Sequence, residues 1–214
     1  MDIRHPLGVV TPTLDGDVLT RLAQAEAAFT PGQLQRLLPD ASVAGIRRVL
    51  NRLAREGVVT ATRAGSAAFV YSLNREHLAA NAVIDLAHLS TTLRARLGDM
   101  LGTWAHPPVY AALFGSWARG DASTESDIDV FLVRPGEVDD DRWFEQVASL
   151  EEQLSRWTGN DARTYVIDQP HLETMRSEPV LASIRDEGLT VHGDSSWFHG
   201  RVSGRRATGD RSTE

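Results

Sequence analysis

The chain of 214 residues contains no cysteine and no lysine. Without cysteine it can form neither a disulfide bond nor a zinc site with thiolate ligands. All 22 basic residues are therefore arginine, a bias from which no function follows. No apolar run approaches the ~18 residues of a membrane-spanning helix, and the N-terminus lacks the basic stretch and apolar core of a signal peptide. The sequence therefore predicts a cytoplasmic protein with no membrane partner.

The charge of the chain is divided unevenly along its length. Residues 1–75 contain nine Arg and six Asp or Glu, a net charge of +3. The rest of the chain has a net charge of −10, which brings the total to −7. The length suits one large or two small domains, and the asymmetry of charge indicates two parts with different partners.

Residues 14–57 have the pattern of three helices, preceded by an arm at residues 1–13 that we expect to be loose or dependent on a partner. Apolar residues recur at helical spacing over Leu14–Ala28. Thr30 and Ser42 are suitable N-caps for a second and a third helix. The apolar stripe of the third predicted helix consists of Val43, Ile46, Leu50 and Leu53.

Two short predicted strands, residues 58–62 and 68–73, follow these helices. This order of elements resembles the winged helix-turn-helix domain of bacterial transcriptional regulators, and we expect such a domain at residues 14–75. The third helix would then be the recognition helix, because arginine binds phosphates or guanine edges and asparagine binds adenine. The alternatives are a solvated helix face and a contact with another domain or a second copy. The candidate DNA-binding residues are Arg47, Arg48, Asn51, Arg52 and, at the hairpin, Arg63.

Residues 76–106 are expected to link this domain to the rest of the chain. Apolar residues recur at helical spacing through this segment, which predicts one long helix or two shorter ones. Such a long apolar stripe can pair with a second copy, so we expect a homodimer. The alternative is that the stripe packs on the second domain.

A strand, a turn and a second strand are predicted over residues 109–133. An apolar run ends at Gly115-Ser116, and Asp127 and Asp129 open a second apolar run. Alternation along a strand places these two carboxylates on one face, where they repel each other unless a cation lies between them. Mg²⁺ typically binds carboxylates together with substrate phosphates, and a glycine-containing turn exposes N–H groups that bind phosphate oxygens. The residues themselves predict metal-assisted chemistry on a nucleotide.

The same residues carry a resemblance to a family. Gly115-Ser116, ten intervening residues and the pair Asp127 and Asp129 resemble the signature of the minimal nucleotidyltransferases of the DNA polymerase beta superfamily. The resemblance implies an α/β domain with a small mixed sheet at residues 107–199, so that the whole chain would be α+β. It also implies two Mg²⁺ ions on the two aspartates and a nucleoside triphosphate substrate, ATP. The residues implied to bind the nucleotide are Gly115, Ser116, Arg119 and Ser126.

Two of these residues are also suited to structural roles. Arg119 can neutralise phosphate charge or pair with an acid that braces the loop, and Ser126 can cap the turn before the aspartates. The elements expected after this turn are a helix from Asp139 to Trp157, a strand at residues 162–167, a helical segment at 170–185 interrupted at Pro179, a strand at 189–192 and a disordered tail at 200–214.

Members of the resembled family carry a third carboxylate on the strand after this helix, where it helps to deprotonate the attacking hydroxyl. The most natural alignment, through Gly159, places Arg163 at that position. Asp161 would lie on the same strand face and is our candidate for the third catalytic acid, with Asp168 as the fallback. If no third acid reaches the metal ions, we expect slow transfer, deprotonation by the substrate, or nucleotide binding without turnover.

The resemblance implies adenylyl transfer to a protein acceptor, as with antitoxins that modify HEPN toxins, or to a tRNA. A DNA-binding domain on such a protein would allow it to regulate its own operon. The alternative is a transcriptional regulator whose nucleotidyltransferase-like domain binds nucleotide without catalysis, which the substitution at Arg163 favours. A third hypothesis, transfer to an aminoglycoside, is made less attractive by the predicted DNA-binding domain.

Overall fold

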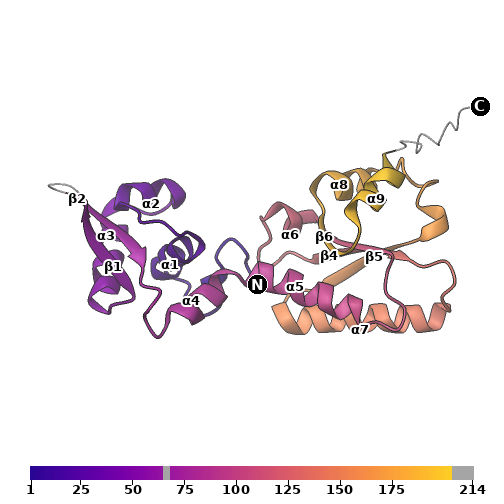
Figure 1. Cartoon of the computed structure of the whole chain (residues 1–214), viewed down its shortest axis with the longest axis horizontal. Helices are drawn as coiled ribbons and strands as arrows, with labels where there is room; N and C mark the ends of the chain where they lie inside the picture. Colours follow the sequence, from indigo (N-terminus) through magenta and orange to yellow (C-terminus); the bar gives the residue numbers. More distant parts are fainter. Residues whose placement is uncertain (65–67, 204–214) are drawn as a thin grey trace, which may run out of the picture. The chain divides into compact units, whose positions relative to one another are not determined.

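Residues 1–64 and 68–203 are described by the structure, a computed structural model, and the chain divides into two units. One unit consists of Asp2–Thr92, and the other consists of Leu93–Glu214 together with Met1 (Figure 1). Within the described residues, no helix is both long enough and apolar enough to cross a membrane.

The first unit combines short helices with one antiparallel hairpin (Figure 1). The side chain of Thr30 accepts a hydrogen bond from the N–H of Gln33, whose side chain accepts one from the N–H of Thr30. Ser42 Oγ accepts a hydrogen bond of 3.0 Å from the N–H of Gly45. Both predicted N-caps are confirmed. The elements are η1 (Pro6–Val9), α1 (Leu14–Gln24), α2 (Pro31–Leu37), α3 (Val43–Arg55), β1 (Val59–Ala64), β2 (Ala68–Leu73) and α4 (Ala80–Ala87).

Helix α1 ends at Gln24, earlier than the predicted end at Ala28. Beyond it, Phe29 exchanges two backbone hydrogen bonds of 2.8 Å with Tyr71 of β2. An extended backbone is needed for this bridge, so the chain leaves the helical conformation before Phe29. The helical spacing of the apolar residues could not show this contact with a distant strand.

The core of the first unit includes part of the N-terminal arm. Leu7 is 2% exposed and belongs to the same core cluster as residues of α1, and η1 packs against α1 and α4, so the prediction of a loose arm is wrong for this segment. Val43 is 38% exposed because it lines a surface groove at the start of α3, and Val49 is buried in the core instead. The predicted apolar stripe of α3 is thus correct for Ile46, Leu50 and Leu53 only.

The segment predicted to link the domains forms two helices, α4 and α5 (Leu89–Gly102), which is one of the two expected alternatives. Val83, Ile84 and Ala87 of α4 pack in the core of the first unit. The boundary between the two units lies within α5, after Thr92. Leu93, Leu97 and Leu101, which follow this boundary, are buried.

The second unit is built on a four-stranded sheet with the strand order β5-β4-β3-β6. Strand β3 is antiparallel to both β4 and β6, whereas β4 and β5 are parallel, so the sheet is mixed, as predicted. The strands are β3 (Tyr110–Phe114), β4 (Ile128–Arg134), β5 (Ala162–Asp168) and β6 (Leu189–Gly193). The other elements are α6 (Gly115–Arg119), α7 (Asp140–Thr158), η2 (Gln169–His171), α8 (Pro179–Glu187) and α9 (Ser195–Val202).

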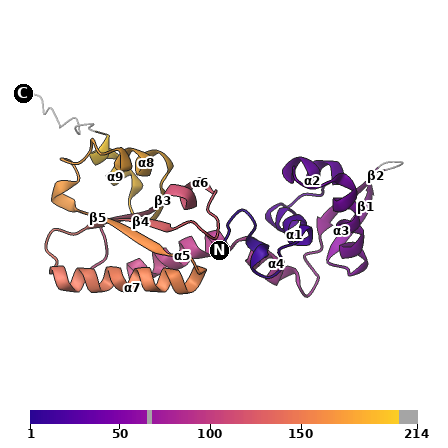
Figure 2. The same ribbon diagram turned by 180° about the vertical axis from the view of Figure 1, so that it is seen from behind.

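Helices cover both faces of this sheet. Helices α5 and α7 lie on one face, and α8 and α9 lie on the other (Figures 1 and 2). On the second face Tyr110 stacks on Phe198 of α9, with ring centroids 4.4 Å apart, and Phe131 of β4 packs against the same ring. Helix α7 begins at the predicted position, where the side chain of Asp139 accepts a hydrogen bond from the N–H of Arg142.

Two expectations for the C-terminal part are wrong. Residues 172–177 form turns, so the predicted helical segment at 170–185 is reduced to η2 and to α8, which begins at Pro179. N–H groups in the first helical turn have no partner within the helix, so proline, which lacks this group, is tolerated there. Pro179 therefore starts this helix and does not interrupt one. Residues 200–202 belong to α9, where Val202 is buried, and the rest of the predicted tail, 204–214, lies outside the described residues.

We predict that Leu7→Ala destabilises the first unit by about 2–5 kcal/mol, because it leaves a cavity in the core. Val9→Ala is the matched control, since Val9 belongs to the same short helix and is 51% exposed. Hydrogen exchange of peptides from α1 and α4, the helices packed against η1, measures the effect. Equal protection in the two variants would show that the arm is not part of the core.

Candidate functional site

The predicted acidic pair lies at the start of β4. Ile128 is fully buried between Asp127 and Asp129, so the two aspartates project to the opposite face of the strand. That face also carries Phe131, which packs against α9, so the pair lies at one end of the face that α8 and α9 cover. Asp129 is paired in register with Phe114, the last residue of β3.

The turn that follows β3 packs directly against the carboxylate of Asp129. Gly115 has a φ of +66°, a conformation that residues with a side chain rarely adopt. A Cβ atom at this position would lie 2.5 Å from Asp129 Oδ2, closer than any real contact. Only glycine therefore allows this turn and this carboxylate to occupy their positions together.

The two carboxylates interact unfavourably at this position. Burial raises the pKa of the Asp129 carboxyl above its ordinary value, and the negative charge of Asp127 raises it further. The positive charges of Arg163 and Arg119 act in the opposite direction on the same pKa. The pair is thus a half-buried concentration of negative charge that favours a cation.

Arg163 supplies positive charge from the neighbouring strand. It is paired in register with Asp129 across the parallel strands β4 and β5, and its Nη1 atom lies 3.0 Å from Asp127 Oδ2. The Arg163 side chain is 72% exposed, whereas that of Asp127 is 30% exposed. The position opposite Asp129 is therefore occupied by a guanidinium group, as the sequence alignment indicated.

Asp161 lies immediately before β5, and its backbone carbonyl accepts a hydrogen bond of 2.8 Å from the N–H of Ile128. Within residues 1–64 and 68–203, no three His, Cys, Asp or Glu side chains are grouped closely enough to hold a metal ion. The role of Asp161 as a third catalytic carboxylate therefore stays a prediction, because its side chain is not grouped with those of Asp127 and Asp129 in the described residues. Asp168, the fallback, pairs at 3.7 Å with Arg134.

The side chains of the acidic pair fit a divalent ion. Asp127 and Asp129 are partly buried carboxylates that repel each other. In proteins, Mg²⁺ is typically bound by one or two such carboxylates together with substrate phosphates. Arginine has only N–H donors and cannot ligate a metal ion, so Arg163 contributes no ligand for a second ion. Asp127 and Asp129 would hold this ion.

The predicted nucleotide-binding residues lie around the same turn. Ser116 follows Gly115 in α6, and its backbone carbonyl accepts hydrogen bonds from Gly120 and Asp121. Arg119 pairs with Asp121 at 3.5 Å and with Glu187 of α8 at 3.8 Å, both exposed contacts of little energy. The bracing role considered for Arg119 is thus present, in a form weak enough to be exchanged for a phosphate.

The loop before the aspartates is held by two side chains. Ser126 Oγ accepts a hydrogen bond of 3.0 Å from the N–H of Ser123, which is the capping role considered for this serine. Asn160, only 2% exposed, donates hydrogen bonds of 2.9 and 2.8 Å to the carbonyls of Ser123 and Ser126. Sequence reasoning missed this role of Asn160, because its hydrogen-bond partners lie more than thirty residues away along the chain.

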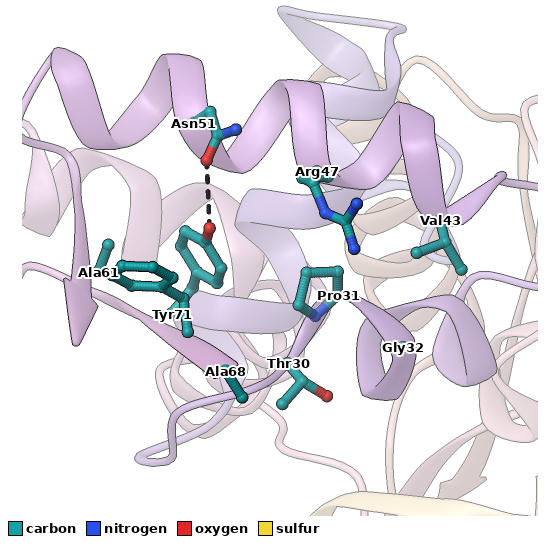
Figure 3. Close-up of a pocket in the computed structure, with 10 residues that line it drawn as sticks. Thr30, Pro31, Gly32, Val43, Arg47, Asn51, Ala61, Ala68 and Tyr71 are labelled. Atoms are coloured by element: carbon teal, nitrogen blue, oxygen red, sulfur yellow. Dashed lines mark hydrogen bonds between the residues drawn. The ribbon is translucent and has the colours of Figure 1, made fainter. Parts of the chain in front are cut away.

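The first unit carries a groove of about 790 Å³ between α2, α3 and the hairpin. Figure 3 shows Arg47 extending from α3 into this groove above Pro31. Asn51, one turn further along α3, accepts a hydrogen bond of 3.1 Å from the hydroxyl of Tyr71 (Figure 3). This bond orients the amide of Asn51. Phe69 of β2 also lines the groove, and 50% of its surface is exposed.

The other predicted DNA-binding residues lie outside this groove. Arg48 is exposed on α3, and Arg52 forms an ion pair with Asp15 of α1. Arg63 is exposed on β1, in register with Phe69. The structure therefore brings Arg47 and Asn51 together on one surface, whereas the guanidinium group of Arg52 is engaged within the unit.

Comparison with known proteins identifies the second unit in part. Residues 105–171 match the family described as polymerase beta, nucleotidyltransferase. No curated protein matches the chain. A solved toxin-antitoxin structure with AMP-PNP has 18% sequence identity over 51% of this chain and 81% of its own, with a TM-score of 0.37. A mutant of the toxin-antitoxin MntA-HpeT has 16% identity over 51% and 83%, with a TM-score of 0.38. Residues 105–171 of the chain are thus similar to the nucleotidyltransferase domain of the polymerase beta family.

We predict that Gly115→Ala both destabilises the second unit by about 1–2 kcal/mol and abolishes binding of Mg²⁺·ATP, because Asp129 must move. Gly120→Ala is the control: its φ is +80°, and a Cβ atom there would meet nothing within 4 Å. It should show the same loss of stability and retain binding. Thermal unfolding and calorimetric titration with ATP measure the two effects, and equal binding by both variants would contradict the steric argument.

Proposed function

We propose that the protein is a Mg²⁺-dependent nucleotidyltransferase that transfers an adenylyl group from ATP to a protein or RNA acceptor. The observation that carries this proposal is the packing of the Gly115 turn against the Asp129 carboxylate. It places the turn that we propose to bind phosphate directly against the acids that we propose to bind the metal ion. The match of residues 105–171 to the nucleotidyltransferase family supports the same conclusion.

The transfer is a displacement at phosphorus. The acceptor hydroxyl oxygen forms a bond to the α-phosphorus of ATP, and the bond from this phosphorus to the α–β bridging oxygen breaks, releasing pyrophosphate. A Mg²⁺ ion on Asp127 and Asp129 supplies charge neutralisation for the triphosphate when it is bound. Since no third carboxylate is grouped with these two in the described residues, the hydroxyl proton passes to the triphosphate or to water.

The protein's own residues bind and orient the nucleotide in this scheme. The hydroxyl of Ser116 and the backbone N–H groups of the Gly115 turn bind the β- and γ-phosphates. Arg119 exchanges its weak contacts with Asp121 and Glu187 for phosphate oxygens. Asn160 and Ser126 position the loop from which the aspartates emerge. A HEPN-like toxin and a tRNA are the acceptors that the signature of this domain favours.

Label transfer tests this function. The protein, [α-³²P]ATP, Mg²⁺ and candidate acceptors should yield a labelled acceptor, and [γ-³²P]ATP should not, because the α-phosphate is the group transferred. Asp127→Asn and Asp129→Asn should each reduce the rate at least ~100-fold, since electrostatic stabilisation of the transferred phosphate is lost. Asp139→Asn, which changes a helix cap on the same unit, is the charge-matched control.

We further propose that the first unit is a winged helix-turn-helix domain that binds DNA and regulates the protein's own operon. Three helices and a hairpin occur in the required order, and α3 presents exposed Arg47, Arg48 and Asn51. The net positive charge of residues 1–75 supports contact with phosphates. The hydrogen bond from Tyr71 holds Asn51 ready to read an adenine edge.

Binding to a duplex from the promoter of the protein's own gene, compared with a scrambled duplex, tests this second role. Arg48→Ala should weaken binding to both duplexes and reduce the slope of log K against log[salt] by about 0.9. Asn51→Ala should cost about 1–3 kcal/mol on the promoter duplex and little on the scrambled one. Arg176→Ala, an exposed arginine of the second unit, is the control. Unchanged affinity and slope in both α3 variants would remove this helix from DNA binding.

The ion pair between Arg163 and Asp127 favours a second candidate function, nucleotide sensing without transfer. A guanidinium group in place of a carboxylate provides no base for the acceptor hydroxyl. This candidate predicts that ATP changes the affinity for the promoter duplex and that no label is transferred. The two experiments above therefore distinguish an enzyme from a nucleotide-responsive regulator.

A further inference from the structure

Arg163 faces both members of the acidic pair from the edge of the sheet. It is in register with Asp129, and its Nη1 atom contacts Asp127 at 3.0 Å. Strand β5 is the first strand in the order β5-β4-β3-β6, so one of its sides has no neighbouring strand. Arg163 is accordingly 72% exposed at its side chain, although it contacts a carboxylate that is only 30% exposed.

The charges around the pair limit what it can bind. The pair consists of two carboxylates with the Arg163 guanidinium beside them, in contact with Asp127 and in register with Asp129, and no third acid is grouped with the pair in the described part of the chain. A divalent ion needs oxygen ligands, which the first two carboxylates and the nucleotide phosphates provide for one ion. A second ion near β5 would meet the Arg163 guanidinium, which repels it and offers no lone pair.

We propose that Arg163 is the built-in second cation of this site, so that the acidic pair takes a single divalent ion together with the nucleoside triphosphate. This inference rests on the proposed function, because it assumes that the pair binds a metal–nucleotide complex. The Arg163 guanidinium neutralises Asp127 before the nucleotide arrives and lies beside the triphosphate afterwards. Arg163 is thus a positioning residue whose charge replaces that of an ion.

An ordinary surface ion pair would have no such effect. Most exposed pairs contribute little to stability, and losing one changes neither the number nor the arrangement of bound ions. The number of ions is therefore the measurement that separates the two interpretations. It also does not depend on whether the loaded protein turns over.

The probe is Mn²⁺ with α,β-methylene ATP, in which the bond that the transfer would break cannot be cleaved. Native mass spectrometry counts the ions retained per chain, and electron paramagnetic resonance distinguishes an isolated Mn²⁺ from two ions at the ~3.5–4 Å spacing of two-metal sites. The wild-type protein should retain one isolated ion. Arg163→Asp, which places a third carboxylate opposite Asp129, should retain a coupled pair of ions. Arg176→Asp, the charge-matched control, should retain one.

Each outcome decides the question. Two coupled ions in the wild-type protein, with the nucleotide analogue bound, would overturn the inference and leave the proposed function intact. A single ion in Arg163→Asp would also overturn it, because Arg163 would not be what excludes the second ion. Failure of the wild-type protein to bind the analogue with Mn²⁺ at all would overturn the proposed function and the inference together. Arg163→Ala should retain one ion, since removing the cation supplies no ligand.

Discussion

Two like charges held at the start of one strand are the constraint on which the second unit depends. Asp127 and Asp129 cannot move apart, because the backbone of β4 and the buried Ile128 between them set their directions. Gly115 then closes on Asp129 so tightly that no side chain fits at its position. The surrounding residues either brace this arrangement, as Asn160 does, or offset its charge, as Arg163 does. Repulsion between two carboxylates that are held this close together is typical of a functional site that binds a cation.

Arg163 places a positive charge beside the acidic pair, at the position where the resemblance to the nucleotidyltransferases led us to expect a carboxylate. Replacing a carboxylate with a guanidinium shifts the local charge by two units and removes a potential ligand and base in one step. The edge position of β5 makes this substitution tolerable, because the long side chain lies largely in solvent and loses little hydration. A buried position would have required a much better partner than one carboxylate at 3.0 Å.

In the first unit, Tyr71 has a comparable organising role. Its backbone pairs with Phe29 and so ends α1, its ring is buried in the core, and its hydroxyl orients Asn51 on α3. One residue of the hairpin thus connects the core of the unit to the groove that bears the candidate base-reading side chain (Figure 3). The groove combines apolar walls with the polar side chains of Thr30, Arg47, Asn51 and Tyr71.

Local signals in the sequence determined the helix starts at Thr30, Ser42 and Asp139, the strands on either side of the Gly115 turn, and the pairing of Asp127 with Asp129 on one face. These features depend on neighbours within a few residues, where capping and alternation act. Tertiary structure alone decided the burial of Leu7, the early end of α1, the role of Asn160 and the contact of Arg163 with Asp127. Each of these depends on a partner from a distant segment, and sequence periodicity carries no information about which distant groups packing will bring together.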